Sequence, residues 1–444
     1  MIEIAYVCNE LGIGGTERGL ANHARSLDRD RYRARAIGVH ALGARADGLR
    51  AAGIQVDCAD GDHDRLVELL RGADVVHLFR SGTTEAPALG AAIAAAPRAI
   101  VETKTFGMVD RSPEARRIDC HLLISKMNAV RYRALVGAPG PEFHARHRVL
   151  PQPLDLADLQ RSAPERAVAR RSLGLDPDRP VICRVGRADD SKWRDLLVDM
   201  VPRLLDLRPD AQVLLVGATE AKRERLRRRG VLERCTLIAP TADEGRVAGF
   251  YAASDVFVNA SELGESQGLV IGEAMALGLP VVTCSTPWVD NAQIEFVEHG
   301  RTGLVANHPN AFAEAVASLL DQPQLARRLG AAGQEDVRRM LDVSVVTAQL
   351  ERLYDSLLAT GAPPPKWSPA PEEVDAFEAE YERRLGLEFR PLTPRERVGA
   401  RVRRELEFAR RLRGLVRKDA LPLAWGMARA KLLAGRPTRG GTAR

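Results

Sequence analysis

One stretch, residues 255–284, limits the possible folds of this chain more than any other. It opens with the apolar, β-prone run 255–259 and continues through a polar loop that holds Glu265 and Gly268. Apolar residues then recur at helical spacing over 269–277, and a glycine and a proline end the helix before a second apolar run. The order strand, loop, helix, strand predicts a crossover unit of a parallel sheet that helices cover on both faces.

Two glutamates bracket the loop of this unit. Glu265 follows the strand directly, and Glu273 lies on the helix after seven intervening residues. Ligands of open α/β sheets bind at the carboxyl ends of the strands, and the start of a helix suits a phosphate. Gly268 lets a ligand approach the backbone closely. We therefore predict a diphosphate at the helix start and polyol hydroxyls on both carboxylates. The alternative is that Glu265 favours the helix dipole and Glu273 is solvated.

The run E-S-Q-G-L-V-I-G-E-A-M-A-L-G-L-P-V-V, which begins at Glu265, resembles the E-x7-E signature of retaining glycosyltransferases of family 4 with the GT-B fold. That resemblance implies two Rossmann-like, doubly wound α/β domains facing across a cleft. It also implies that Glu265 contacts the donor sugar, that Glu273 contacts the nucleotide ribose, and that the backbone of residues 267–269 holds the diphosphate. Gln267 stands where the family usually has an aromatic residue.

A second loop carries two cations after the expected strand at 180–186. Its sequence, G-R-A-D-D-S-K-W from Gly186, resembles the family's G-R-x4-K-G. Arg187 and Lys192 would stabilise the negative charge that builds on a departing nucleoside diphosphate. Trp193 replaces the usual glycine, and we expect it to pack on the base or the acceptor. The alternative is a loop paired with its own aspartates. The implied donor-binding residues are Gly186, Ser266, Gln267, Gly268, Leu269 and Glu273.

The first half of the chain alternates strands and helices with short connections, which predicts another parallel sheet. The loop after its first strand contains Gly14 and Gly15 and resembles the family's G-G-x-E-R segment, which faces the cleft. The family often carries a histidine after the strand expected at 99–103. Lys104 and Thr105 stand there, and we expect Lys104 to substitute for that histidine; the alternative is a solvated surface lysine.

Two further departures concern backbone geometry. Gln152 and Pro153 replace Asn-Gly in the family's V-I-P-N-G-V-D, which closes the first domain. Residues 288–292 stand where two glycines usually approach the donor.

A chain of 444 residues is too long for one ordinary core. We expect an acceptor domain at 1–165, a nucleotide-sugar donor domain at 166–345, a crossover helix at 346–361, and a Pro-rich linker with a basic helical tail at 362–444.

The excess of positive charge belongs to the tail. The chain has a net charge of +6, but residues 390–444 hold 16 Arg and Lys against 4 Asp and Glu, so the rest carries −6. Attachment of this tail to an anionic membrane is one hypothesis; packing on an acidic body, or disorder, are the alternatives. We expect no nucleic-acid partner, because aromatic residues do not interleave with the basic ones.

The remaining composition favours a cytoplasmic protein, in one hypothesis peripheral at the inner membrane face. No run of 18 apolar residues and no signal-like N-terminus occurs. The six cysteines are scattered and never form C-x-x-C. Asp62-His63-Asp64 has the form of a D-x-D metal motif, but its place at a helix start favours capping.

Together these features predict a retaining glycosyltransferase, a hexosyltransferase in cell-envelope or polysaccharide biosynthesis. It would move a sugar from a nucleotide-sugar donor to a glycan, lipid or small-molecule acceptor. Glu265, Arg187 and Lys192 are the expected catalytic residues, and the resemblance implies no essential metal and no other cofactor. Alternatives are a sugar-nucleotide epimerase, a phosphorylase, or a catalytically decayed membrane-associated scaffold.

Overall fold

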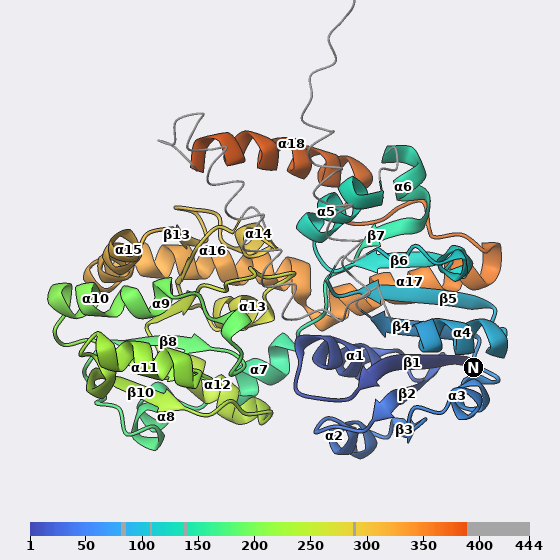
Figure 1. The fold of residues 1–444 in the computed structure, drawn as a ribbon, viewed down its shortest axis with the longest axis horizontal. Helices are drawn as coiled ribbons and strands as arrows, with labels where there is room; N and C mark the ends of the chain where they lie inside the picture. Colours follow the sequence, from blue (N-terminus) through green and yellow to red (C-terminus); the bar gives the residue numbers. More distant parts are fainter. Residues whose placement is uncertain (81–85, 107–108, 137–139, 287–289, 389–444) are drawn as a thin grey trace, which may run out of the picture.

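The computed structural model describes residues 1–80, 86–106, 109–136, 140–286 and 290–388. Two parallel sheets, each covered by helices on both faces, lie side by side (Figure 1). This confirms the expected pair of Rossmann-like domains. The basic helix expected beyond Pro394 and part of the segment 288–292 lie outside the described residues.

The first sheet contains seven strands in the order β3-β2-β1-β4-β5-β6-β7. Its strands are β1 (Ile2–Glu10), β2 (Tyr32–Ala41), β3 (Gln55–Cys58), β4 (Val75–Arg80), β5 (Ala99–Lys104), β6 (Cys120–Leu123) and β7 (His147–Val149). Its helices are α1 (Gly15–Ser26), α2 (Ala46–Ala51), α3 (His63–Leu70), α4 (Ala86–Ala95), α5 (Lys126–Val136) and α6 (Gly140–Arg146). Strand order reverses between β1 and β4, so a crevice opens at their carboxyl ends.

The alternation of side chains along β1 shows why this strand lies in the middle of the sheet. Ile4 and Tyr6 belong to a core that includes side chains of α1, whereas Ala5 and Val7 belong to a core with side chains of α3 and α4. Successive residues of a strand point to opposite faces, so a strand covered on both sides must be apolar throughout.

The second sheet contains six strands in the order β10-β9-β8-β11-β12-β13, with the same reversal between β8 and β11. Its strands are β8 (Val181–Val185), β9 (Gln212–Val216), β10 (Cys235–Ile238), β11 (Val256–Asn259), β12 (Val281–Thr283) and β13 (Gly303–Val305). The helices around it are α7 (Leu156–Ser162), α8 (Arg166–Ser172), α9 (Leu196–Asp199), α10 (Val201–Leu207), α11 (Glu220–Arg228), α12 (Glu244–Ala252), α13 (Leu269–Ala276), α14 (Gln293–Phe296), α15 (Pro309–Asp321) and α16 (Pro323–Leu341).

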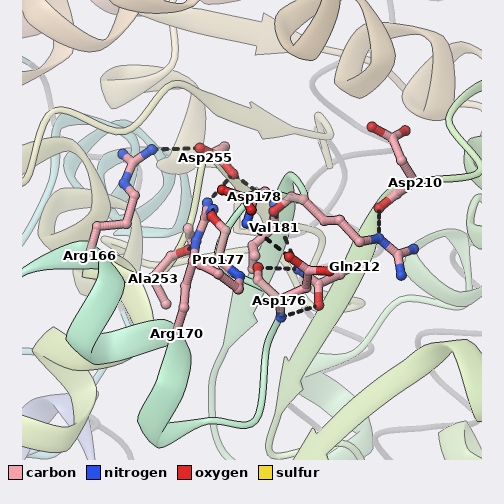
Figure 2. Close-up of polar contacts among 12 residues, drawn as sticks. Arg166, Arg170, Asp176, Pro177, Asp178, Val181, Asp210, Gln212, Ala253 and Asp255 are labelled. Carbon is pink, nitrogen blue, oxygen red and sulfur yellow. Dashed lines mark hydrogen bonds and ion pairs between the residues drawn. The ribbon is translucent and has the colours of Figure 1, made fainter.

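The amino ends of β8 and β11 are joined by charged contacts (Figure 2). Asp255 accepts hydrogen bonds from the backbone N–H of Val181, at 2.7 Å, and from the Arg170 guanidinium, at 2.6 Å. Arg170 also donates to the carbonyl of Ala253. These contacts fix the amino ends of the strands, whereas ligands of open α/β sheets bind at the carboxyl ends. We therefore assign this cluster a structural role.

Two chain segments connect the domains, and they run next to each other. The backbone N–H of Leu154 donates to the carbonyl of Leu341 at 2.8 Å, and the N–H of Val343 donates to the carbonyl of Leu154 at 2.9 Å. The second segment leads into α17 (Val343–Thr360), whose apolar side chains join the core of the first domain. The last described helix, α18 (Pro371–Glu388), packs on α5 through Val374 and Phe377.

None of the helices among the described residues combines the length and the apolar character needed to span a bilayer. All six cysteines are free thiols.

Candidate functional site

A cavity of about 220 Å³ lies between the two domains, at the carboxyl ends of their strands. Loops that follow β1, β5, β8 and β11 line it together with the start of α13. Of the residues that the sequence nominated, these line the cavity: Gly14, Gly15, Thr105, Gly186, Arg187, Lys192, Glu265, Ser266, Gln267, Gly268, Leu269 and Glu273. The structure thus brings together twelve of the thirteen residues; Lys104 is the exception.

Lys192 and Glu265 meet where the loops after β8 and β11 converge. The Lys192 Nζ lies 2.8 Å from the Glu265 Oε2. Asn259 Nδ2 donates to the other carboxylate oxygen at 3.5 Å, and the Gln293 amide oxygen accepts from the Glu265 backbone N–H at 3.1 Å. Glu265 is 7% exposed, so these partners hold a buried carboxylate in one orientation.

Arg187 is held much more loosely than Lys192. Its side chain is 52% exposed, and its Nη2 lies 3.7 Å from the Asp189 carboxylate. An exposed pair at that distance contributes little, so the guanidinium remains available to an anion in the cavity. Trp193, by contrast, is 1% exposed and does not line the cavity, which corrects the expectation that it packs on a base or an acceptor.

Gly268 begins α13 in a backbone conformation that favours glycine. Its φ is +92°, and none of the described side chains caps the first turn of the helix. A left-handed residue at this position is strained for any residue with a Cβ. The chain therefore presents the start of α13 directly to the cavity, which is the arrangement that binds phosphates at helix ends.

Glu273 is buried at 1% exposure and has two partners. The Tyr251 hydroxyl donates to its Oε2 at 2.7 Å, and Arg18 of the first domain donates to its Oε1. Arg18 also lies 3.7 Å from Glu244, which is paired with Arg45 at 3.1 Å. Sequence reasoning missed the role of Arg18, although it is the final residue of the G-G-x-E-R segment.

Gln267 and Gln152 pair across the connection between the domains. The Gln267 side chain accepts from the backbone N–H of Gln152 at 2.8 Å and donates to its carbonyl at 3.0 Å. Both residues were departures from the family pattern. The amide of Gln267 thus replaces an aromatic contact with a two-point hydrogen bond to the interdomain segment.

Further contacts join the first domain to the donor loop. The Ser125 hydroxyl donates to the carbonyl of Ser266 at 2.7 Å, and the Glu295 carboxylate accepts from the backbone N–H of Met127 at 2.7 Å. Burial raises the pKa of Glu295. A Cβ built on Gly15 would lie 3.5 Å from Leu269, so the glycine loop also reaches the second domain. In addition, the Ser125 hydroxyl accepts from the N–H of Asn128 at 3.0 Å and so caps the start of α5.

The structure corrects the placement of Lys104. Its side chain is fully buried, and its Nζ lies 2.8 Å from Glu102 Oε2, away from the cavity lining. Glu102 also pairs with Arg80 and contacts His121, and despite its burial the charges of Lys104 and Arg80 and the hydrogen bond with His121 hold the pKa of Glu102 well below its usual range. Lys104 is therefore neither a substitute for the family's histidine nor a solvated surface residue.

We expect Lys104→Met to lower the free energy of unfolding by about 3 kcal/mol, because it removes one partner of a buried ion pair. The loss should lie at the low end of such effects, because Glu102 keeps Arg80 and His121. Urea titration measures it. Arg33→Met, which disrupts an exposed pair with Glu3, is the control and should change stability by under about 1 kcal/mol. Equal stability of Lys104→Met and the wild type would contradict the assignment.

Metal ligands do not gather in the described part of the chain. No group of three or more His, Cys, Asp or Glu is arranged there to hold an ion. Asp62 instead caps α3 by accepting from the backbone N–H of Arg65 at 2.9 Å, as the sequence predicted.

The sequence matches to known proteins lie mainly in the second domain. Residues 179–322 match the model of the family described as glycosyl transferases group 1. A phosphatidyl-myo-inositol mannosyltransferase of Mycobacterium leprae is 33% identical over 181 residues, which cover 40% of this chain and 47% of that protein. A D-inositol 3-phosphate glycosyltransferase of Catenulispora acidiphila is 36% identical over 197 residues, which cover 41% and 45%. The chain thus spans about half the length of these curated relatives.

The fold is similar over a longer range. The crystal structure of HepE from Anabaena, in complex with UDP and glucose, has a TM-score of 0.67 and 19% sequence identity, and the match covers 80% of this chain and 100% of that one.

Proposed function

Residues 179–322 match the glycosyl transferases group 1 family, and from that premise we propose that the protein is a retaining glycosyltransferase with a nucleotide-sugar donor. The donor would bind mainly to the second domain and the acceptor mainly to the first. The observation that carries the proposal is the 2.8 Å contact between Lys192 and Glu265 in a cavity that Glu273 also lines.

The diphosphate of the donor would lie at the start of α13, with Arg187 and Lys192 around it. Negative charge grows on the diphosphate as the bond to the sugar breaks, so fixed cations stabilise the transition state more than the ground state. The open start of α13 adds backbone N–H groups of residues 267–269. No step of this scheme uses a metal ion.

Glu265 and Glu273 would hold hydroxyl groups at the two ends of the donor. Lys192 and Asn259 orient the Glu265 carboxylate, which suits it to accept hydrogen bonds from the sugar. Tyr251 orients the Glu273 carboxylate toward the ribose. Arg18 also donates to this carboxylate, so the ribose would lie beside Arg18.

In the transfer step the bond between the anomeric carbon and the diphosphate oxygen breaks, and an acceptor oxygen bonds to the same face of that carbon. The acceptor proton passes to the departing phosphate oxygen. This front-face course retains the anomeric configuration. Thr105 and the loop with Gly14 and Gly15 line the cavity from the first domain, where the acceptor would enter.

The acceptor is proposed as a class only. The two curated relatives are named for sugar transfer to phosphatidyl-myo-inositol and inositol phosphate. A role in cell-envelope or polysaccharide biosynthesis would fit an acceptor that is a glycan, a lipid or a polyol. Product analysis with and without such an acceptor separates transfer from epimerisation and phosphorolysis.

The test is a calorimetric panel of UDP, GDP, ADP and their sugar conjugates against wild type and Glu273→Gln. We expect one base to bind the wild type, and the variant to bind it about 10–100-fold more weakly, because a charged hydrogen-bond acceptor contributes roughly 1.5–3 kcal/mol. Glu298→Gln, which alters an exposed pair with Arg301, is the control and should bind like the wild type. If no nucleotide binds the wild type below about 1 mM, the proposal fails.

A further inference from the structure

Arg184 and Trp193 form a buried pair behind the loop that carries the two proposed phosphate-binding cations. Arg184 lies on β8 and is 1% exposed, as is Trp193. The guanidinium carbon of Arg184 lies 4.5 Å from the centroid of the Trp193 ring, a distance at which a cation and an aromatic face attract each other.

The pair holds the two ends of the loop. Arg184 Nη2 donates to the carbonyl of Lys192 at 2.6 Å, and Trp193 Nε1 donates to the carbonyl of Arg187 at 3.1 Å. A Cβ built on Gly186 would come within 1.9 Å of the Arg184 Nη1, so the guanidinium runs directly beneath the start of the loop. The positions of Arg187 and Lys192 therefore depend on Arg184 and Trp193.

The charge of Arg184 has no carboxylate partner of its own within the described ranges, where its nitrogens bond only backbone carbonyls and its Nε bonds nothing. Burial lowers the pKa of Arg184 to about 10, while the charge of Glu265 opposes that shift, so the group stays charged at neutral pH. A buried cation without a paired anion is costly, and such groups persist where another role requires them. Arg184 also lines the cavity, and a bound anion there would offset that cost.

We propose that Arg184 is a third cation of the diphosphate subsite, which favours the bound diphosphate through its charge and holds Lys192 in position. The Trp193 ring packs against the Arg184 guanidinium and supports it. The inference rests on the proposed function, because it assumes a nucleoside diphosphate in the cavity. It assigns Arg184 as a positioning residue that acts on the ligand from behind the loop.

The test compares Arg184→Gln with Arg184→Lys. Both side chains retain a donor for the Lys192 carbonyl, but only lysine retains the charge. Binding of the nucleoside diphosphate that the wild type selects is measured by calorimetry, and binding of the matching nucleoside is measured by ligand-observed NMR. We expect Arg184→Gln to weaken diphosphate binding 10–100-fold and to leave nucleoside binding within twofold. We expect Arg184→Lys to recover at least half of that loss on a logarithmic scale.

The outcomes separate this inference from the function on which it rests. Equal weakening of nucleoside and diphosphate by Arg184→Gln, or no weakening of either, overturns the role of Arg184 while the donor site stands. A wild type that binds neither ligand overturns both. Should Arg184→Gln fail to fold, Trp193→Phe decides: it keeps a ring beneath Arg184 but loses the N–H to the Arg187 carbonyl, and it should weaken the diphosphate at least threefold with the nucleoside unchanged. No such selective loss in Trp193→Phe overturns the inference.

Discussion

An Arg187→Ala variant should keep its fold and lose about 10²–10³-fold in turnover, the cost of removing one fixed group that stabilises transition-state charge. The side chain is half exposed and makes a weak ion pair with Asp189, so its removal should change the free energy of unfolding by under about 0.5 kcal/mol. The effect should fall on kcat more than on KM, because charge develops on the diphosphate only as the glycosidic bond breaks. Release of the nucleoside diphosphate from the selected donor measures both constants.

Arg203→Ala is the matched control for this experiment. Arg203 lies in the same domain, its side chain is 41% exposed, and it pairs with Glu314 at 3.4 Å, yet it does not line the cavity. It should keep full turnover. Lys192→Ala should also lower turnover but is a poorer probe, because it leaves Glu265 without its cation. Unchanged turnover in Arg187→Ala would remove Arg187 from the proposed diphosphate site.

The loop-to-helix unit at 255–284 could be predicted from the sequence because its constraints are local. Apolar spacing gives β11 and α13, a left-handed residue requires Gly268, and parallel strands place their loops at one edge. The meeting of Lys192 and Glu265 follows, because β8 and β11 are neighbours in the sheet.

The misplaced residues depend on contacts between distant segments. Lys104 is the last residue of β5, and the Glu102 carboxylate and the Tyr132 ring beside it favour the burial of its charge. A position at a strand end gives no sign of such a network, and an isolated lysine is usually exposed. Trp193 was misplaced because its partner Arg184 lies on a buried strand, where an arginine is rarely expected.

Two departures from the family pattern proved to be partners. Gln152 and Gln267 lie 115 residues apart, and the sequence showed each only as a separate departure. Together they form a two-point hydrogen bond between the interdomain segment and the loop before α13. A single substitution relative to the family pattern can therefore suggest that a site has decayed when its partner, a second substitution, lies in another domain.

The first domain should lose stability steeply as the pH falls below about 6.5, the ordinary pKa of histidine. Three histidines there are neutral: His23 and His77 are buried, and His147 is half-buried. Burial lowers the pKa of His23 and of His147 to about 3 each, and lowers that of His77 well below the usual value. The unfolded state therefore binds protons that the folded state does not. The protein has its full stability above the pKa of histidine in the unfolded state, and it loses stability as the pH falls from that value toward the pKa in the folded state. Burial also lowers the pKa of His121, although the hydrogen bond with Glu102 opposes this shift, so the prediction uses the other three histidines.

Below about pH 6.5, each such histidine lowers the free energy of unfolding by about 1.4 kcal/mol per pH unit. The three together should therefore lower it by roughly 6 kcal/mol between pH 7 and pH 5. That is comparable to the whole stability of an ordinary domain. Hydrogen exchange, corrected for the intrinsic effect of pH, should show protection lost in β1 and β4 before β8 and β11. His23→Leu removes a side chain whose Nδ1 has no hydrogen-bond partner in the described structure. This variant should take up one proton fewer on unfolding, so its free energy of unfolding should depend less steeply on pH. Equal loss of protection in both sheets, or an unchanged slope in this variant, would show that the folded first domain accepts these protons and that burial does not keep its histidines neutral.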